Sequence, residues 1–300
     1  MALREHWSWP AITAAGGLGA FTGLAFLVNA IVSPDGAGAF EFGVWSAVIA
    51  GSAVVFVFLF FHALQLATGW REAGARGLGP LLCYVAFAAA IVAFLWVGRG
   101  PITQLRPAAA LAVSRVLVVV ALTAAAPTVL GLWLVNTRLQ RISRALSAPT
   151  NPPTRADAVL ADLIGCRRAV GVCLTVLATI ITIAVVGSGA QRRAFLATGV
   201  PPEKFPPEWV LLYGALFTAI SLLLYVPTFV AWRTRCMMFV DQCYPLPADA
   251  RPTAEWVDGR TRLIGVLGAD VTVAKSLTAA FGLLAPLAVS VLSVVVPGLK

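Results

Sequence analysis

Few residues of this 300-residue chain combine a reactive side chain with a place inside an apolar segment. His62 lies near one end of the apolar segment 43–67, and Arg115 directly precedes the segment 116–135. A buried histidine can bind a metal or exchange a proton, and a buried arginine can bind an anion. No Asp or Glu lies within any long apolar segment to pair with them. His62 and Arg115 are candidate polar sites, although a histidine bonded to a carbonyl and an arginine reaching the membrane surface are the simpler interpretations.

Other stretches that resemble catalytic motifs are wrongly placed for catalysis. Ser188 lies between glycines in "VGSGA", but at the opposite membrane face from His62, beyond the reach of proton transfer. Lys275 in "ADVTVAK" borders the last apolar segment, without the carboxylate counter-ion that a retinal Schiff base needs. The five cysteines show no metal-ligand spacing. We predict no catalytic residue, no bound metal and no cofactor.

The elements that carry these residues are apolar enough to lie in a membrane. Apolar residues make up 59% of the chain and charged residues only 12%, and the mean hydropathy is +0.88. A helix needs about 20 apolar residues to cross a bilayer. The sequence therefore predicts an all-α, polytopic membrane helix bundle of about seven transmembrane helices, near residues 10–32, 43–67, 79–98, 116–135, 169–189, 209–232 and 276–297.

We expect residues 1–300 to form a single integral membrane domain, because no internal repeat or soluble domain interrupts these segments. Two inner loops, 136–168 and 233–275, are long enough for short amphipathic cytoplasmic helices. In the first, the prolines of "SAPTNPPTRAD" end one helix, and Asp157 begins the next. On the other side, "PPEKFPPEW" predicts a stiff, extended entry to the sixth span, with a helix start at Glu208.

The second inner loop contains an amphipathic pattern. Its apolar residues share one helical face: Trp256, Leu263, Ile264 and Leu267. This pattern predicts a helix that lies flat on the membrane surface or packs beneath the bundle.

Basic residues set the predicted orientation. Most of the 22 lysines and arginines flank the segments on one side, which is the cytoplasmic side under the positive-inside tendency. This places the N-terminus in the cytoplasm and the C-terminus outside, in the inner (plasma) membrane of a bacterial-type cell. We expect segment 10–32 to remain as the first span, because it is longer than the apolar core of a signal peptide. Its cleavage would leave six spans.

Arg138, Arg141 and Arg144 recur at every third residue where the fourth span ends, and are therefore predicted to line one face of a helical extension. Such a stripe suits anionic lipid headgroups at the cytoplasmic face or a cytosolic protein partner. A purely topogenic role is the simpler interpretation.

Gly19 and Gly23 form a GxxxG motif in the first span. Small residues at this spacing let two helix backbones approach closely. We expect this face to pack within one chain, with a homo-oligomer interface as the alternative.

Together these features favour a non-enzymatic, multi-pass membrane protein that acts as a scaffold or as a membrane component of a larger assembly, with no nucleic-acid partner. One alternative is an oligomeric channel, pore or membrane-perturbing effector, lined by hydroxyl pairs such as Thr218 and Ser221 or Ser290 and Ser293. Another is a carrier of neutral or apolar solutes whose helices break at Asn29, Pro127 or Pro227.

Overall fold

The computed structural model describes residues 8–32, 36, 38–68, 78–97, 108–147, 156–247 and 251–270. Within these residues every regular element is a helix. The elements are α1 (Ser8–Val32), α2 (Ala39–Thr68), α3 (Leu78–Val97), α4 (Ala108–Ser147), α5 (Ala156–Ala197), the 3-10 helix η3 (Pro202–Lys204), α6 (Glu208–Cys243) and α7 (Ala254–Leu267).

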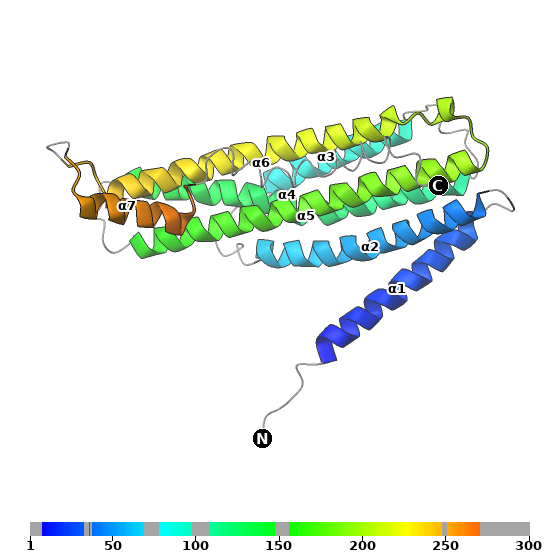
Figure 1. The fold of residues 1–300 in the computed structure, drawn as a ribbon, viewed down its shortest axis with the longest axis horizontal. Coiled ribbons are helices and arrows are strands. Elements are labelled where there is room, and N and C mark those ends of the chain that lie inside the picture. Colours follow the sequence, from blue (N-terminus) through cyan, green and yellow to red (C-terminus); the bar gives the residue numbers. More distant parts are fainter. Residues whose placement is uncertain are drawn as a thin grey trace, which may run out of the picture.

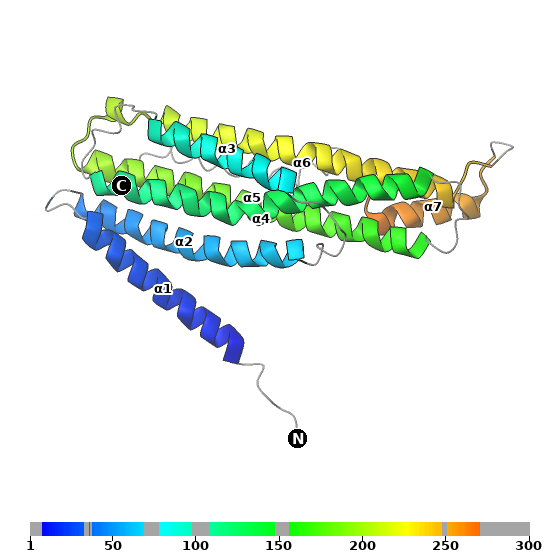
Figure 2. The ribbon, with the colours of Figure 1, turned by 180° about the vertical axis from the view of Figure 1, so that it is seen from behind.

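The three longest helices run side by side along the whole molecule. α5 is antiparallel to α4 and α6, and all three contact one another (Figure 1). α2 packs against α4 and α5, α3 packs against α4, and α1 crosses α2 with its N-terminal end pointing away from the bundle (Figure 2). We call the end that holds Arg138, Arg167 and Arg233 the basic end, and the end with the α1–α2 and α5–α6 connections the opposite end.

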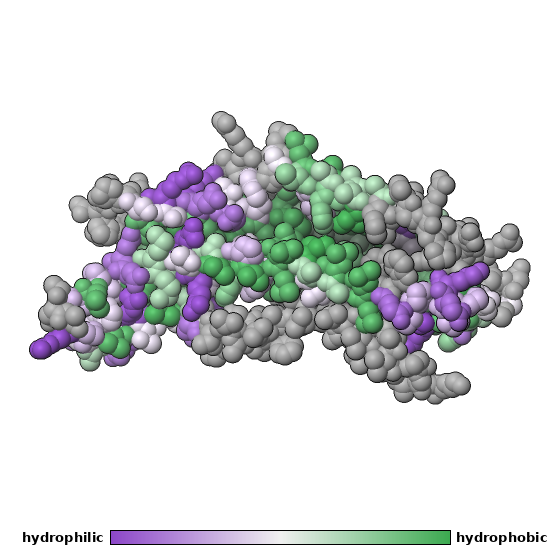
Figure 3. Space-filling model, turned by 90° about the horizontal axis from the view of Figure 1, so that it is seen from above, coloured by the Kyte–Doolittle hydropathy of each residue, from purple (hydrophilic) through white to green (hydrophobic). Residues whose placement is uncertain are grey.

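The first six predicted spans lie within α1 to α6. Four helical stretches are long and apolar enough to cross a membrane: Ala39–Leu64, Ala109–Ser147, Ala156–Ala197 and Val210–Cys243. Two shorter apolar stretches, Gly16–Val32 and Leu81–Ala93, belong to α1 and α3. The predicted span 276–297 lies outside the described residues. Figure 3 shows apolar side chains gathered in a band between two hydrophilic ends.

The described residues of the predicted inner loops 136–168 and 233–275 are mostly helix, because α4, α5 and α6 continue into them and α7 lies in the second. α4, with 40 residues, and α5, with 42, are each about 60 Å long, twice the thickness of a bilayer core. α5 begins at Ala156, beside the predicted start at Asp157. α6 continues to Cys243 because Cys236, Phe239 and Val240 find buried contacts beyond the apolar band.

α7 confirms the predicted helix but not the position flat on a membrane surface. Its first turn lies beside the end of α6, and its last residue, Leu267, contacts Arg167 of α5. α7 therefore runs back alongside α6 and packs against the bundle (Figure 1).

The opposite end is closed by aromatic packing. Phe42 meets Trp45 and Phe195 edge-on, with ring centroids 6.0 and 5.6 Å apart. Phe205 stacks on Phe195 at 6.1 Å, so the proline-rich segment folds inward through η3 instead of extending as predicted. Arg192 donates a 2.9 Å hydrogen bond to the Phe205 carbonyl. α6 starts at Glu208, as predicted.

Candidate functional site

The basic end carries a second structural unit, which we call the extension: residues 136–147, 156–168, 233–243 and 254–270. It joins the ends of α4, α5 and α6 to α7, beyond the apolar band. Its buried residues continue the core of the spanning helices and include Leu139, Ile142, Leu163, Cys166, Cys236, Phe239, Val240 and Leu267. Four helices around a shared apolar core are the arrangement of a helix bundle.

Side chain to backbone hydrogen bonds fix the three long helices against one another in the extension and at its border with the apolar band. Trp232, only 2% exposed, donates its indole N–H to the Leu163 carbonyl at 3.0 Å, which joins α6 to α5. Gln242 of α6 donates to the Leu146 carbonyl in the last turn of α4. That carbonyl lacks a partner in its own helix, so the bond also caps α4.

The end of α7 is fixed by Arg167 of α5. The Arg167 guanidinium donates a 3.1 Å hydrogen bond to the Leu267 carbonyl. Its positive charge also interacts favourably with the negative end of the α7 helix dipole. Gly268 ends α7 with φ +64°, and Ala269 bonds back to the Ile264 carbonyl. A Cβ on Gly268 would lie 1.7 Å from a guanidinium nitrogen of Arg167. Glycine is therefore favoured here by its conformation, and a side chain would displace the Arg167 guanidinium.

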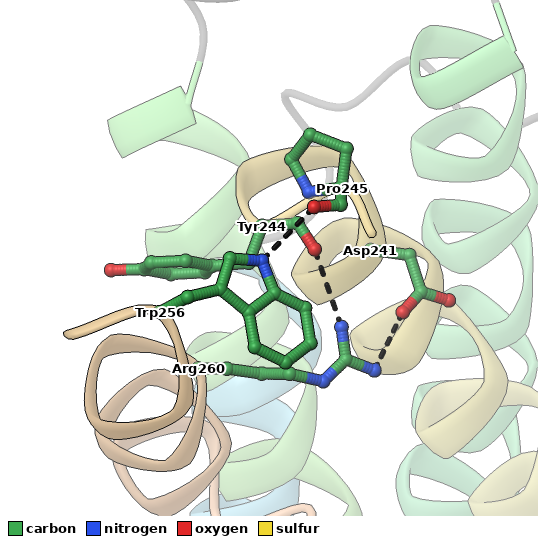
Figure 4. Close-up of polar contacts among 5 residues, drawn as sticks. All are labelled: Asp241, Tyr244, Pro245, Trp256 and Arg260. Atoms are coloured by element: carbon green, nitrogen blue, oxygen red, sulfur yellow. Dashed lines mark hydrogen bonds and ion pairs between the residues drawn. The ribbon is translucent and has the colours of Figure 1, made fainter. Parts of the chain in front are cut away.

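The connection between α6 and α7 is held by the cluster in Figure 4. Trp256 donates its indole N–H to the Pro245 carbonyl at 2.9 Å, and Arg260 lies over the Trp256 ring. Arg260 also pairs with Asp241 at 2.7 Å and donates to the Tyr244 carbonyl. These contacts hold α7 as a rigid part of the extension.

The three arginines at the end of α4 differ in their contacts and exposure. Arg138 forms an ion pair with Asp162 of α5, and both side chains are about one-third exposed, at 31% and 36%. Arg141 and Arg144 are exposed. Each step of three residues rotates about 60° around a helix, which turns Arg144 away from the α4–α5 contact. Arg138 is thus a contact within the extension, while Arg141 and Arg144 are presented outward.

His62 and Arg115 lie at different levels of the bundle. Phe56 of α2 and Ala124 of α4 share one core cluster and mark a common level. His62 is about 9 Å from this level toward the basic end, and Arg115 about 14 Å toward the opposite end. His62 is exposed and stacks on Phe58, with ring centroids 6.2 Å apart. The structure does not bring these two candidates into one site.

Gly19 and Gly23 lie on the exposed side of α1, and a Cβ on either would meet no described neighbour within 4 Å. No described part of the chain therefore packs against this motif, and packing against the remaining residues stays a prediction. The α1–α2 contact uses other glycines: Gly17 lies opposite Val54, and Phe21 packs over Gly51. An interface with a second copy stays a prediction.

Thr218 and Ser221 face the inside of one bundle, where they are 5% and 3% exposed. They do not lie on the surface that another copy would meet. Neither Pro127 nor Pro227 breaks its helix, because α4 and α6 continue through them. Cys166, Cys173 and Cys236 are unpaired and buried, as expected of small apolar residues.

Comparison of the chain with protein-family models, curated proteins and solved structures finds no match.

Proposed function

We propose that this chain is a non-enzymatic integral membrane protein of seven spans, in the inner (plasma) membrane of a bacterial-type cell, and that it docks a cytosolic protein onto its extension. The observation that carries the proposal is the continuity of α4, α5 and α6 from the apolar band into the extension, where α7 completes a packed core. A bundle of this kind holds a docking surface in a fixed position relative to the membrane.

The extension has an apolar core of its own because water surrounds it, whereas lipid surrounds the apolar band. Within lipid the hydrophobic effect does not drive helices together, whereas apolar burial in water stabilises by about 25 cal/mol per Å². Fully buried side chains such as Leu139, Leu163 and Leu267 therefore stabilise the extension where it enters water. A rigid surface loses little conformational freedom when a partner binds, which favours binding.

The exposed charges of the extension indicate the class of partner. Arg141 and Arg144 project from α4, while Arg168 and Arg233 lie where α5 and α6 leave the apolar band. Arg168 and Arg233 are placed to contact anionic lipid headgroups, and each basic side chain contributes about 1 kcal/mol of binding free energy near a membrane surface. Arg141 and Arg144 extend further from the band and suit an acidic protein surface, whose approach they would steer.

The orientation in this proposal follows from the same charges. The extension is the basic end, and basic residues in short connections collect in the cytoplasm. The N-terminus is then cytoplasmic and the C-terminus outside. Accessibility labelling of single cysteines placed at Ala145 and at Glu203, in a variant without native cysteines, tests this. Labelling of residue 203 only from the cytoplasmic side would show that the topology is the opposite of the proposed one.

In-cell photo-crosslinking tests the docking function. A photo-reactive amino acid replaces Ala145, which is exposed next to Arg144, and in a second variant replaces Leu223, which is 74% exposed in the apolar band. We expect the residue 145 probe to give a discrete adduct with a soluble protein, and the residue 223 probe to give lipid adducts. Charge reversal of Arg141 and Arg144 to Glu should abolish the protein adduct, while Arg193→Glu at the opposite end should leave it unchanged.

Two results would contradict the proposal. An adduct that survives reversal of both arginines would show that they do not form the docking surface. An adduct of twice the mass of the chain would instead favour the homo-oligomer, with the extension as a contact between copies.

A further inference from the structure

Most described hydroxyl groups in the apolar helices follow one rule, and three buried ones do not. A serine or threonine in such a helix can satisfy its hydroxyl by donating to the carbonyl four residues earlier. The described hydroxyls that do so include those of Ser46, Ser52, Ser114, Thr123, Thr175, Thr179, Ser188 and Thr228.

Thr128, Thr218 and Ser221 are the exceptions. Their side chains are 0%, 5% and 3% exposed, and their hydroxyl oxygens have no hydrogen-bond partner. A buried hydroxyl left unpaired costs free energy, although a bond to its own helix would remove this cost. These three hydroxyls therefore point into the bundle, away from the carbonyls that satisfy their neighbours.

The three hydroxyls lie on the inward faces of α4 and α6, which pack against each other and against α5. Thr218 and Ser221 are one turn apart, about 4.5 Å along α6. They belong to the buried stripe of α6 that continues to Tyr225 and Trp232. Thr128 belongs to the buried stripe of α4 that continues to Leu132 and Val135.

A proline frees a backbone acceptor in the same part of α4. Pro127 has no N–H, so the carbonyl of Thr123 loses its usual partner within α4. Ordered water and hydroxyl side chains are the usual partners of backbone groups freed by proline within membrane helices. Pro127 therefore frees one carbonyl of α4 in the turn that precedes Thr128.

We propose that Thr128, Thr218 and Ser221 form a neutral polar site that holds water in the middle of the bundle. The hydroxyls can both donate and accept, which is what a buried water needs from two to four partners. The nearest charged residues along α4 are Arg115 and Arg138, both more than two turns away, so the site favours an uncharged ligand over an ion. The site is independent of the docking function proposed for the extension.

Radiolytic footprinting detects such water, because a hydroxyl radical generated from a bound water oxidises the nearest side chains even when they are buried. Cys173 reports on the site, since its sulfur lies 3.2 Å from the Cβ position of Gly131, one turn from Thr128. Cys236 is the matched reporter in the core of the extension, at 0% exposure against 2% for Cys173.

We expect Cys173 to be oxidised several times faster than Cys236 in the intact protein. The triple variant Thr128→Val, Thr218→Val, Ser221→Ala should bring Cys173 down to the rate of Cys236. The control Thr228→Val removes a hydroxyl of the same bundle that is already bonded to Leu224, and should leave the Cys173 rate unchanged.

The thermal unfolding midpoint in detergent provides a second readout that does not depend on thiol chemistry. If water occupies the site, Ser221→Ala and Thr128→Val lower the midpoint, because bonds to the water are lost. Equal oxidation of the two cysteines in the native protein, or midpoints that rise on removing these hydroxyls, would overturn the proposal.

Discussion

Arg167 and Leu267, a hundred residues apart in the chain, are joined by a 3.1 Å hydrogen bond from the guanidinium to the last carbonyl of α7. The guanidinium fills the space beside Gly268, where any other residue would place a Cβ. One arginine thus connects a spanning helix to the only described helix that lies wholly within the extension.

Gly268→Ala should be destabilising. The new Cβ would displace the Arg167 guanidinium from the Leu267 carbonyl, and φ +64° is unfavourable for alanine by about 1 kcal/mol or more. We expect a lower unfolding midpoint and faster proteolysis of residues 244–253. Gly265→Ala is the control: it lies in the same helix with open space around its Cβ position, so it should be neutral or stabilising by up to about 1 kcal/mol. Equal effects of the two substitutions would contradict this account.

Trp232→Phe should destabilise the contact between α5 and α6 by about 1 to 3 kcal/mol. Phenylalanine retains most of the buried surface but leaves the Leu163 carbonyl without the indole donor at 3.0 Å. Chemical denaturation followed by circular dichroism measures the loss. Trp133→Phe, on the half-buried side of α4, serves as the comparison and should change stability less. A larger loss at Trp133 would place the critical contact elsewhere.

The Arg138–Asp162 ion pair should contribute modestly. Both side chains are about one-third exposed, so solvent and salt screen the pair, and a coupling of up to about 1 kcal/mol is expected. A double-mutant cycle with Arg138→Gln and Asp162→Asn measures this coupling at low and high salt. The coupling should fall as salt rises. A coupling that is large and independent of salt would show a buried pair instead.

Gly38→Ala should loosen the opposite end. Gly38 has φ +89°, and a Cβ there would lie 2.8 Å from Thr198 of the α5–α6 connection. Gly36→Ala is the control: Gly36 has φ +101° but no described neighbour within 4 Å of its Cβ position, so this substitution introduces backbone strain without a steric clash. We expect Gly38→Ala to lower the unfolding midpoint further than Gly36→Ala. Restored stability in Gly38→Ala, Thr198→Ser would confirm the steric cause.

Gly19→Ile and Gly23→Ile test the exposed face of α1. Since neither glycine has a described neighbour within 4 Å, both variants should retain the stability of the single chain. If this face joins two copies, bulky side chains there prevent close approach, and cross-linked dimers should disappear. Gly51→Ile, which would clash with Phe21 inside the chain, should instead lower stability. Unchanged dimers in both α1 variants would exclude this interface.

The all-helical class, the order and the approximate position of the described apolar helices could be predicted from the sequence, because runs of about 20 apolar residues have few other structures available. The count of seven spans stays a prediction. The amphipathic pattern of Trp256, Leu263, Ile264 and Leu267 likewise predicted α7. These features depend on local composition, which the sequence shows directly.

Features that depend on contacts between distant residues could not be predicted. Nothing local signals that Asp162 pairs with Arg138 or that Arg167 caps α7. The GxxxG motif of Gly19 and Gly23 marked a possible close approach without indicating which face of α1 meets α2. The unpaired hydroxyls of Thr128, Thr218 and Ser221 became visible only once the bundle placed them in its interior.

The uninterrupted course of α4, α5 and α6 has a mechanical consequence. One part of each helix lies in the apolar band and the other in the extension, and α5, which contains no proline, is the stiffest of the three. A tilt of about 5° of a rod about 60 Å long displaces its tip by about 5 Å. A change in bilayer thickness or lateral pressure that tilts these helices would therefore move the tip of the extension by more than the length of a hydrogen bond. A molecule bound there would be displaced by the same distance.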